Sequence, residues 1–301
     1  MTMKMFLLAG LLAAASLQPV GAQALPAPRE ITYKSTATGD LQLSLHLPAV
    51  AAPGQRPLVV WVHGGSWSRG SKDDLPSSNP HLYSALLQQG YAIASVGYRL
   101  SGEARFPAPV QDINDAVNFL HDHGREYGVD GSAVVMAGRS AGGHLASLVG
   151  LINGHGTPSF AKPALYKVKG IVSFFGPADL LISEGKHSMS PERLARSPTA
   201  RMLGDVPADN PVLARQASPI TYVSRQSAPT LLLHGRKDVQ VPLAHSIALQ
   251  QALKAQGVET DLRIEDDAAH SAKVFDSAAH VPAVIAFVQR HLPVPCKPQP
   301  H

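Results

Sequence analysis

The feature that most constrains the fold is a series of short apolar runs that alternates with helical patterns from residue 57 onward. The runs are LVVWV (58–62), YAIASVGY (91–98), AVVMAG (133–138), GIVSFF (170–175), PTLLLHG (229–235) and TDLRIE (260–265). Such runs are typical of strands buried on both faces, and parallel sheets bury their strands this way because crossover helices cover both sides. The sequence therefore predicts an α/β fold with a mostly parallel central sheet and helices on both faces.

The segments beside these runs fit the same architecture. Near the N-terminus, ITYKST (31–36) and LQLSLHLP (41–48) alternate apolar and polar residues, which predicts an antiparallel N-terminal hairpin with one exposed face. One helical face is predicted from residues at helical spacing: Val110, Ile113, Val117 and Leu120. A second helix should cover 244–257 and end at a glycine, and a last helix should run from about Ser271 to Leu292.

Length and composition favour one globular domain. The chain has 301 residues, of which 45% are hydrophobic and 16% are charged, so it can bury a substantial core. The net charge is +4, but the lysines and arginines are scattered singly, which argues against a nucleic acid partner. We predict a single catalytic domain over 25–301.

The first 24 residues differ from the rest and are typical of a secretory signal peptide. Lys4 precedes an apolar run from Phe6 to Leu17, and Ala22 and Ala24 supply small residues at the usual cleavage spacing. About a dozen apolar residues are too few to span a bilayer comfortably, so an uncleaved anchor is the weaker alternative. We expect cleavage after Ala24, a secreted or periplasmic mature chain, and no stable membrane association.

Cysteine and histidine usage gives no indication of a metal site or another cofactor. The only cysteine is Cys296, so no intrachain disulfide and no cysteine-based zinc cluster can form. The 14 histidines show no HExxH spacing. We therefore expect chemistry that needs neither a metal nor an organic cofactor.

Ser140 is the candidate nucleophile. It lies in GRSAG (138–142), a GxSxG pattern that follows a predicted strand and opens a predicted helix. The flanking glycines permit a tight turn, and a helix N-terminus favours developing negative charge. The alternative is an ordinary tight turn with no chemical role.

A serine nucleophile needs donors for the oxyanion that its attack creates. HGGSW (63–67) follows the LVVWV run and offers glycine N–H groups without side-chain obstruction. We expect an oxyanion hole formed by the backbone N–H groups of Gly64, Gly65 and Ala141. The alternative for HGGSW is a glycine turn after a strand.

Asp238 and His270 are the candidate partners of Ser140. Asp238 follows the 229–235 run and His270 follows the 260–265 run, so both should reach the carboxyl edge of the sheet. The order serine, aspartate, histidine also fits a strand–turn–helix nucleophile. For Asp238, the alternatives are a solvated loop residue or a helix cap.

Other residues compete for these roles. His280 should lie within the last helix, and His144, one turn after Ser140, is interpreted as a packing residue. Asp266 and Asp267 lie too close to His270 along the loop to be preferred over Asp238. They stay as backup carboxylates.

Taken together, these motifs resemble those of an α/β-hydrolase, in the esterase branch that carries an HGGxW oxyanion motif. HGGSW, GRSAGGHLA and HGRKDVQVP occur in order, and further stretches match in spacing: YRLS (98–101), FPAPVQDINDAVNFL (106–120), FFGPADL (174–180) and ASPITYV (217–223). The resemblance covers nearly all of the chain after the predicted signal peptide. It implies acyl-ester chemistry like that of feruloyl and acetyl-xylan esterases and hormone-sensitive-lipase-like carboxylesterases, without naming the acyl group.

Two positions depart from that branch. Arg139 precedes the candidate nucleophile where an acidic residue is frequent, and Ser66 replaces the third glycine of the oxyanion motif. Arg139 is a candidate for contact with an anionic or phenolic substrate, with surface or structural pairing as the alternative. Trp67 is a candidate for shaping the acyl pocket, with packing under its loop as the alternative.

The sequence thus predicts a secreted serine carboxylic-ester hydrolase that acts on small acyl, acetyl or feruloyl esters. The expected partner is a small-molecule ester. An arylformamidase-like amidase, a prolyl-oligopeptidase-like peptidase and a non-catalytic binding module on the same fold are the alternatives. The polar segment 181–218 is too long for a simple connection and is expected to cover the site as a cap.

Overall fold

The computed structural model describes residues 26–49, 54–182 and 190–295. The predicted signal peptide and Cys296 therefore lie outside the described residues. Among the helices of the described segments, none is both long enough and apolar enough to cross a bilayer.

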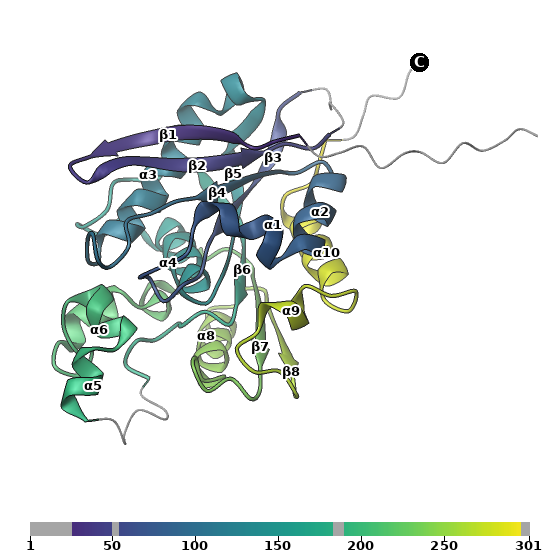
Figure 1. The fold of residues 1–301 in the computed structure, drawn as a ribbon. Coiled ribbons are helices and arrows are strands. Elements are labelled where there is room, and N and C mark those ends of the chain that lie inside the picture. Colours follow the sequence, from purple (N-terminus) through teal and green to yellow (C-terminus); the bar gives the residue numbers. More distant parts are fainter. Residues whose placement is uncertain (1–25, 50–53, 183–189, 296–301) are drawn as a thin grey trace, which may run out of the picture.

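Eight strands form one sheet in the order β1-β2-β4-β3-β5-β6-β7-β8 (Figure 1). The strands are β1 (Arg29–Thr36), β2 (Gly39–His46), β3 (Arg56–Val62), β4 (Ala92–Val96), β5 (Val129–Arg139), β6 (Lys167–Phe174), β7 (Thr230–Gly235) and β8 (Thr260–Glu265). β1 pairs antiparallel with β2, and β2 with β4, while every other pairing is parallel. The predicted fold class, a mostly parallel sheet with an antiparallel N-terminal hairpin, is confirmed.

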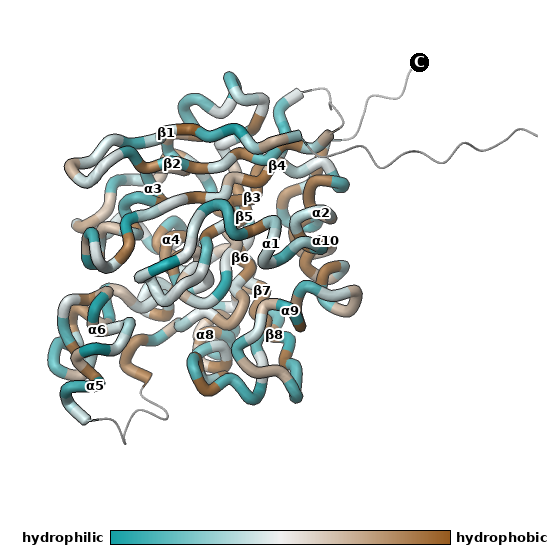
Figure 2. The backbone as a smooth tube through the Cα atoms, viewed as in Figure 1, coloured by the Kyte–Doolittle hydropathy of each residue, from teal (hydrophilic) through white to brown (hydrophobic). Residues whose placement is uncertain are grey.

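Helices cover both faces of the sheet and divide the core into two apolar layers. α3 (Ala108–His123), α4 (Ala141–His155) and α8 (Ala244–Ala255) bury residues in one layer, and α2 (Pro80–Gln88) and α10 (Val281–His291) bury residues in the other. The strands β3, β4 and the second half of β5 lie between the layers, which is why they are almost continuously buried. Figure 2 shows hydrophobic residues along these strands and on the helices beside them.

Shorter helices lie in the connections. They are η1 (Lys72–Asp74), α1 (Leu75–Ser78), η2 (Gly124–Tyr127), α5 (Pro191–Ala195), α6 (Pro198–Leu203), α7 (Pro211–Gln216), η3 (Pro219–Tyr222) and α9 (Ala272–Phe275). α5 and α6 lie together at one side of the molecule (Figure 1). Three of these helices, α5, α6 and α7, thus belong to the segment 181–218 that the sequence predicted as a cap.

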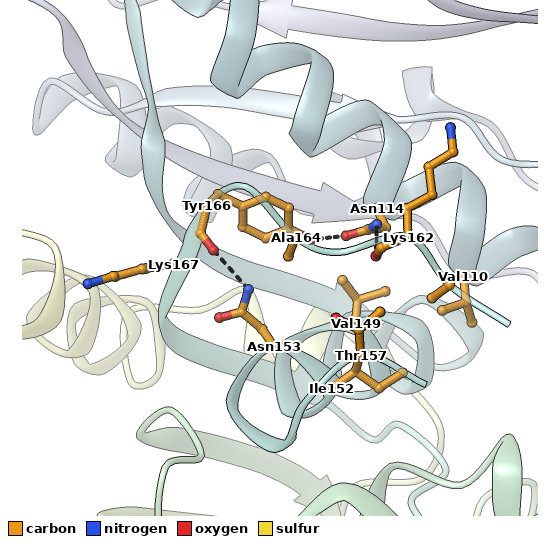
Figure 3. Close-up of a pocket in the computed structure, with 11 residues that line it drawn as sticks. Val110, Asn114, Val149, Ile152, Asn153, Thr157, Lys162, Ala164, Tyr166 and Lys167 are labelled. Carbon is orange, nitrogen blue, oxygen red and sulfur yellow. Dashed lines mark hydrogen bonds between the residues drawn. The ribbon is translucent and has the colours of Figure 1, made fainter. Parts of the chain in front are cut away.

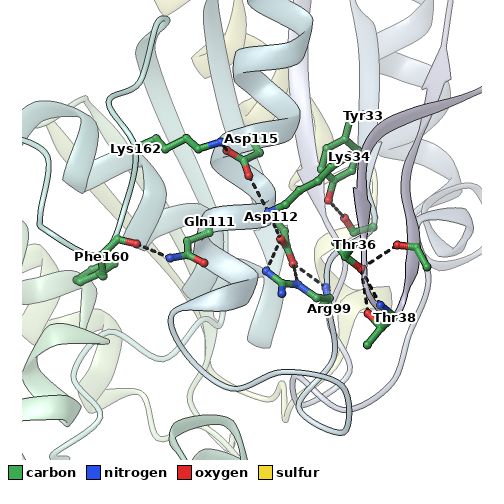
Figure 4. A network of polar contacts seen from close by, with 12 residues as sticks. Tyr33, Lys34, Thr36, Thr38, Arg99, Gln111, Asp112, Asp115, Phe160 and Lys162 are labelled. Carbon is green, nitrogen blue, oxygen red and sulfur yellow. Dashed lines mark hydrogen bonds and ion pairs between the residues drawn. The ribbon is translucent and has the colours of Figure 1, made fainter.

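A buried carboxylate ties the N-terminal hairpin to α3. Asp112 is fully buried and accepts two hydrogen bonds from the Arg99 side chain, at 2.8 Å each, and one from Nζ of Lys34 on β1, at 2.9 Å. The Arg99 backbone N–H donates to the same carboxylate at 3.1 Å (Figure 4). Since two cations and a backbone N–H compensate the buried charge, this cluster fixes where the loop after β4 leaves the sheet.

The predicted last helix is wrong in its extent, because the chain between Ser271 and Leu292 forms two helices, α9 and α10. Between them, the Asp276 carboxylate accepts hydrogen bonds from the backbone N–H groups of His81, at 3.0 Å, and Leu82, at 2.7 Å, in the first turn of α2. Pro282 then lies in the first turn of α10, where a missing N–H costs nothing. A contact distant in sequence therefore ends the first helix.

Candidate active site

Ser140 lies at a strained turn between β5 and α4. Its backbone has φ 53° and ψ −123°, and a positive φ is unfavourable for any residue other than glycine. The Ser140 N–H donates to the carbonyl of Phe174 at 2.8 Å, which ties the turn to the end of β6. Such a turn presents the hydroxyl above the carboxyl edge of the sheet.

The turn depends on glycine because the α4 N-terminus packs directly on the end of β3. A Cβ atom added at Gly142 would lie 2.0 Å from the carbonyl oxygen of Val62, and one at Gly138 would lie 2.5 Å from that of Gly142. Both neighbours are backbone atoms, so no side-chain rotation relieves the clash. The spacing GxSxG therefore has a steric cause here.

His270 reaches Ser140 from the loop between β8 and α9. Its Nε2 atom lies 2.9 Å from Oγ of Ser140. The Phe175 ring packs edge-on against the imidazole, with 4.6 Å between the ring centroids. The histidine is thus held on one side by an aromatic ring and faces the hydroxyl on the other.

Asp238 completes the contact from the loop after β7. Its Oδ2 atom lies 2.6 Å from Nδ1 of His270, and its Oδ1 atom accepts the backbone N–H groups of Gln240 and Val241 at 2.9 Å each. The carboxylate is buried. Sequence reasoning singled out these three side chains, and the structure brings them together.

His234 supports the carboxylate and was missed by the sequence analysis. Its Nε2 atom lies 3.5 Å from Oδ2 of Asp238, and its Nδ1 atom lies 2.7 Å from Oγ of Ser246. Burial alone raises the pKa of Asp238, but contacts with both histidines and a backbone N–H outweigh burial and hold that pKa well below its ordinary value. The carboxylate is therefore ionised throughout the neutral range. The motif HGRKD contains His234, but nothing in it indicated a contact four residues later.

The competing residues take other partners. Asp266 and Asp267 are exposed and form ion pairs with Arg236 and Lys237. His280, which the sequence analysis put within the last helix, instead precedes α10, and its Nε2 atom lies 2.9 Å from Oε1 of Glu265. The helix break at Asp276 explains this difference.

The HGGSW loop lies beside the Ser140 turn. A Cβ atom at Gly64 would lie 2.9 Å from the carbonyl oxygen of Arg139 and 3.5 Å from Cβ of Ser140. Gly65, Ser66 and Trp67 all have positive φ, at 117°, 55° and 56°. In the described part of the chain, the N–H groups of Gly64 and Gly65 donate to no backbone carbonyl. Gly64 and Gly65 line one cavity with Ser140, and Ala141 opens α4 directly after it, so these N–H groups stay the candidate donors for an oxyanion.

Two cavities meet at Ser140 and His270. One, of about 340 Å³, is mainly apolar and is lined by Trp67, Ala141, Pro177, Leu180, Ile182, Pro198, Val239 and Val241, among others. The other, also of about 340 Å³, is polar and is lined by Gly64, Gly65, Arg69, Asp74, Arg139 and Gln240, among others. The segment predicted as a cap contributes Ile182 and Pro198 to the apolar wall. A bound ester would therefore place its two halves in different environments.

Trp67 is buried and forms part of the apolar wall. Its Nε1 donates to Nδ1 of His144 at 3.1 Å, so the other nitrogen of His144 carries the proton and donates to the carbonyl of Ala217 at 2.7 Å. Burial lowers the pKa of His144 to about 4, against the opposing effect of the Ala217 carbonyl. The neutral histidine thus fixes the indole, as its interpretation as a packing residue leads one to expect.

A third cavity, of about 180 Å³, lies away from Ser140 between α3 and α4. The Tyr166 hydroxyl donates to the Asn114 side chain at 3.0 Å, and the Asn153 side chain donates to the Tyr166 carbonyl at 2.9 Å (Figure 3). These polar groups satisfy one another. Among the described residues, no group of three or more histidine, cysteine, aspartate or glutamate side chains is arranged to hold a metal ion.

Comparison with known proteins gives the family. Esterase LipQ of Mycobacterium tuberculosis is 34% identical over 232 residues, which are 76% of this chain and 53% of LipQ, so the chain spans about half of that relative. A bifunctional GH43-CE protein of Bacteroides eggerthii superposes with a TM-score of 0.76 at 28% identity, covering 88% of this chain and 35% of that one. A truncated carbohydrate esterase from gut microbiota superposes with a TM-score of 0.76 at 22% identity, covering 90% and 98%.

The family model named BD-FAE matches residues 43–253, which is more than half of the chain. This range includes the HGGSW loop, Ser140 and Asp238, and it ends before His270. The chain therefore belongs to the BD-FAE family, in the esterase branch of the α/β-hydrolases.

Proposed function

We propose that this protein is a serine carboxylic-ester hydrolase that works through an acyl-enzyme on Ser140. The observation that carries the proposal is the continuous contact from Oγ of Ser140 through His270 to the buried carboxylate of Asp238, at 2.9 and 2.6 Å. The strained backbone of Ser140 supports the same conclusion, since such strain is concentrated at functional sites. Similarity to proteins named esterases supports the ester as the scissile group.

In the first half of the reaction, Oγ of Ser140 attacks the ester carbonyl carbon while Nε2 of His270 takes the hydroxyl proton. The carbonyl electron pair moves to oxygen, and the N–H groups of Gly64, Gly65 and Ala141 stabilise the resulting oxyanion. When that pair re-forms the carbonyl, the bond to the alcohol breaks. The imidazolium gives its proton to the leaving oxygen, and the acyl group stays on Ser140.

Hydrolysis of the acyl-enzyme repeats these steps with water. His270 takes a proton from the water, whose oxygen attacks the acyl carbon, and the same oxyanion donors act again. Collapse releases the acid and returns the proton to Ser140. The ionised Asp238 stabilises the imidazolium in both halves and holds Nδ1 in the protonated tautomer.

We further propose a small acyl group, such as acetyl, or a feruloyl group as the transferred group. The apolar cavity of about 340 Å³ is at the small end of ligand pockets. Trp67 lines this cavity and its indole is hydrogen-bonded to His144, so the cavity favours short or planar acyl groups over long flexible chains. The comparisons do not name the acyl group.

Export is part of the proposal. The apolar run from Phe6 to Leu17 and the small residues before Leu25 support a signal peptide cleaved after Ala24. Expression of the full chain in a bacterium with a secretory pathway, followed by N-terminal sequencing of the periplasmic and extracellular fractions, tests this. A protein that keeps Met1 and stays in the cytoplasm would contradict it.

The activity is tested with p-nitrophenyl acetate, butyrate and octanoate and with methyl ferulate, using the mature chain. We expect hydrolysis that Ser140→Ala and His270→Ala abolish, while the matched exposed variants Ser132→Ala and His121→Ala keep it. A burst of p-nitrophenol equal to the enzyme concentration would demonstrate the acyl-enzyme. If every ester is inert and a p-nitroanilide or N-formylkynurenine is cleaved, an amidase replaces the esterase. If all of these substrates are inert, a non-catalytic binding role replaces the esterase proposal.

A further inference from the structure

The polar cavity beside Ser140 contains an unusual pair of cations. Arg139 and Arg69 both line it, and the acidic residue that shares it is Asp74. The remaining titratable group of the lining is His270. The cavity therefore has an excess of positive charge next to the Ser140 hydroxyl.

Arg139 packs against the HGGSW loop at its base, and among the described residues its head group has no anionic partner. Its Cγ atom would lie 3.4 Å from a Cβ atom at Gly64, so the aliphatic stem packs on the HGGSW loop. Its Nε is buried and has no hydrogen-bond partner within the described residues. Arg139 is half-buried, and it forms no ion pair there either, whereas buried guanidinium groups are usually paired.

Asp74 does not neutralise Arg139. One oxygen of Asp74 accepts the Ser71 N–H at 3.0 Å, in a capping box at the start of η1. This carboxylate opposes the fall in the pKa of Arg139 that burial causes, but only from a distance. Within the part of the chain that the structure describes, the partial burial of this charge is thus offset by no ion pair.

We propose that the polar cavity is a subsite for a carboxylate, so that the enzyme prefers esters that carry a carboxylate on the half of the molecule opposite the apolar cavity. The guanidinium of Arg139 binds this group in a charge-assisted contact, and Arg69 at the rim adds a second positive charge. This deepens the proposed esterase function and rests on it. The substitution of arginine for the more frequent acidic residue before the nucleophile then has a role in specificity.

Two pairs of substrates test the preference, one for each half of the ester. 4-Acetoxybenzoate is compared with 4-acetoxybenzamide, where the charge is on the alcohol, and monomethyl glutarate with methyl 4-carbamoylbutanoate, where it is on the acyl group. Each kcat/KM is divided by the rate constant for hydrolysis of the same ester by hydroxide, which removes intrinsic reactivity. We expect the carboxylate to be preferred about tenfold or more in one pair, as charged hydrogen bonds imply.

Variants assign the preference to Arg139. Arg139→Gln should bring the ratio within a pair close to one, Arg139→Lys should keep part of it, and the exposed control Arg263→Gln should keep all of it. An equal preference in the wild type and Arg139→Gln, or no preference in the wild type, overturns the proposal. If Arg139→Gln fails to fold, competitive inhibition of the wild type by 4-hydroxybenzoate must exceed that by 4-hydroxybenzamide, and equal inhibition overturns it.

The same assays separate the two proposals. If the esterase proposal is wrong, neither member of a pair is hydrolysed, or Ser140→Ala hydrolyses both as well as the wild type does. Failure of the carboxylate subsite leaves both members hydrolysed at equal normalised rates by a Ser140-dependent reaction.

Discussion

Oδ2 of Asp238 lies 2.6 Å from Nδ1 of His270, while Oδ1 of the same carboxylate accepts two backbone N–H groups from its own loop. The loop thus orients the carboxylate by contacts that do not involve the histidine. Only the imidazole tautomer with a proton on Nδ1 fits this acceptor, and that tautomer leaves Nε2 free to receive the Ser140 proton. The geometry gives Asp238 an orienting role that a neutral amide cannot fill.

Asp238→Asn should therefore lower kcat for p-nitrophenyl acetate by about 10⁴, the effect known for the same change in a serine protease triad. The fold should persist because Asn keeps an acceptor for the loop N–H groups. Asp267→Asn, which loses only an exposed ion pair to Lys237, is the matched control and should keep full activity. The opposite pattern, with Asp267→Asn inactive, would identify the backup carboxylate as the true partner.

Much of this site could be predicted because its parts are local. A strand, a glycine-flanked serine and a helix occupy one stretch around Ser140, and parallel strands bring Asp238 and His270 to the same edge whatever the packing between them. Other features depend on contacts between distant segments. The residues around Asp276 do not indicate that the backbone N–H groups of His81 and Leu82 donate to its carboxylate. The break in the predicted last helix could therefore not be predicted from the hydrophobic pattern of that segment.

The same reasoning explains which site features were missed. The division into an apolar and a polar cavity arises from loops after four different strands, and no single motif encodes it. The positive φ at Trp67 is also hidden in the sequence, since a bulky residue is not expected there. The hydrogen bond from its indole to His144, which lies 77 residues later in the chain, is equally invisible in the motif.

Gly142→Ala should destabilise the protein by about 3 kcal/mol, the upper end of the range for overpacking, because the new methyl group meets the backbone carbonyl of Val62 at 2.0 Å. Gly102→Ala is the matched control, since a Cβ atom there meets nothing within 4 Å. Urea unfolding measures both. Equal stability of the two variants would mean that the α4 N-terminus can move away from β3 without cost.

His144→Phe should destabilise the protein by about 1–3 kcal/mol at pH 7, because it leaves the Trp67 N–H and the Ala217 carbonyl unpaired. Trp67 also loses its anchor, so KM for short acyl esters should rise. His121→Phe, at an exposed position, is the control. Unchanged stability would show that water replaces the histidine at both contacts.

His144 also makes stability depend on pH. Its pKa is about 4 in the folded protein and about 6.5 when unfolded, so between these values the unfolded chain binds a proton that the folded protein does not. The free energy of unfolding should fall as pH decreases from 6.5 to 4, by about 3 kcal/mol from this residue alone. Urea unfolding at several pH values should give a shallower decline for His144→Phe than for the wild type. If the free energy of unfolding declined equally with pH in both proteins, His144 would not be the buried neutral histidine proposed here.

Asp276→Ala should lower the free energy of unfolding by about 1–2 kcal/mol, the usual loss when a helix cap is removed, because the first turn of α2 loses the acceptor of two N–H groups. Asp276→Asn keeps one oxygen acceptor and should recover part of the loss. Asp205→Ala is the control and should change stability by less than about 0.5 kcal/mol, because Asp205 is exposed and, among the described residues, its carboxylate accepts a hydrogen bond only from the neighbouring Val206 N–H. Since α2 and α10 share one apolar layer, the loss should also speed hydrogen exchange in both helices. Faster exchange in α2 alone would mean that Asp276 caps one helix without joining the two.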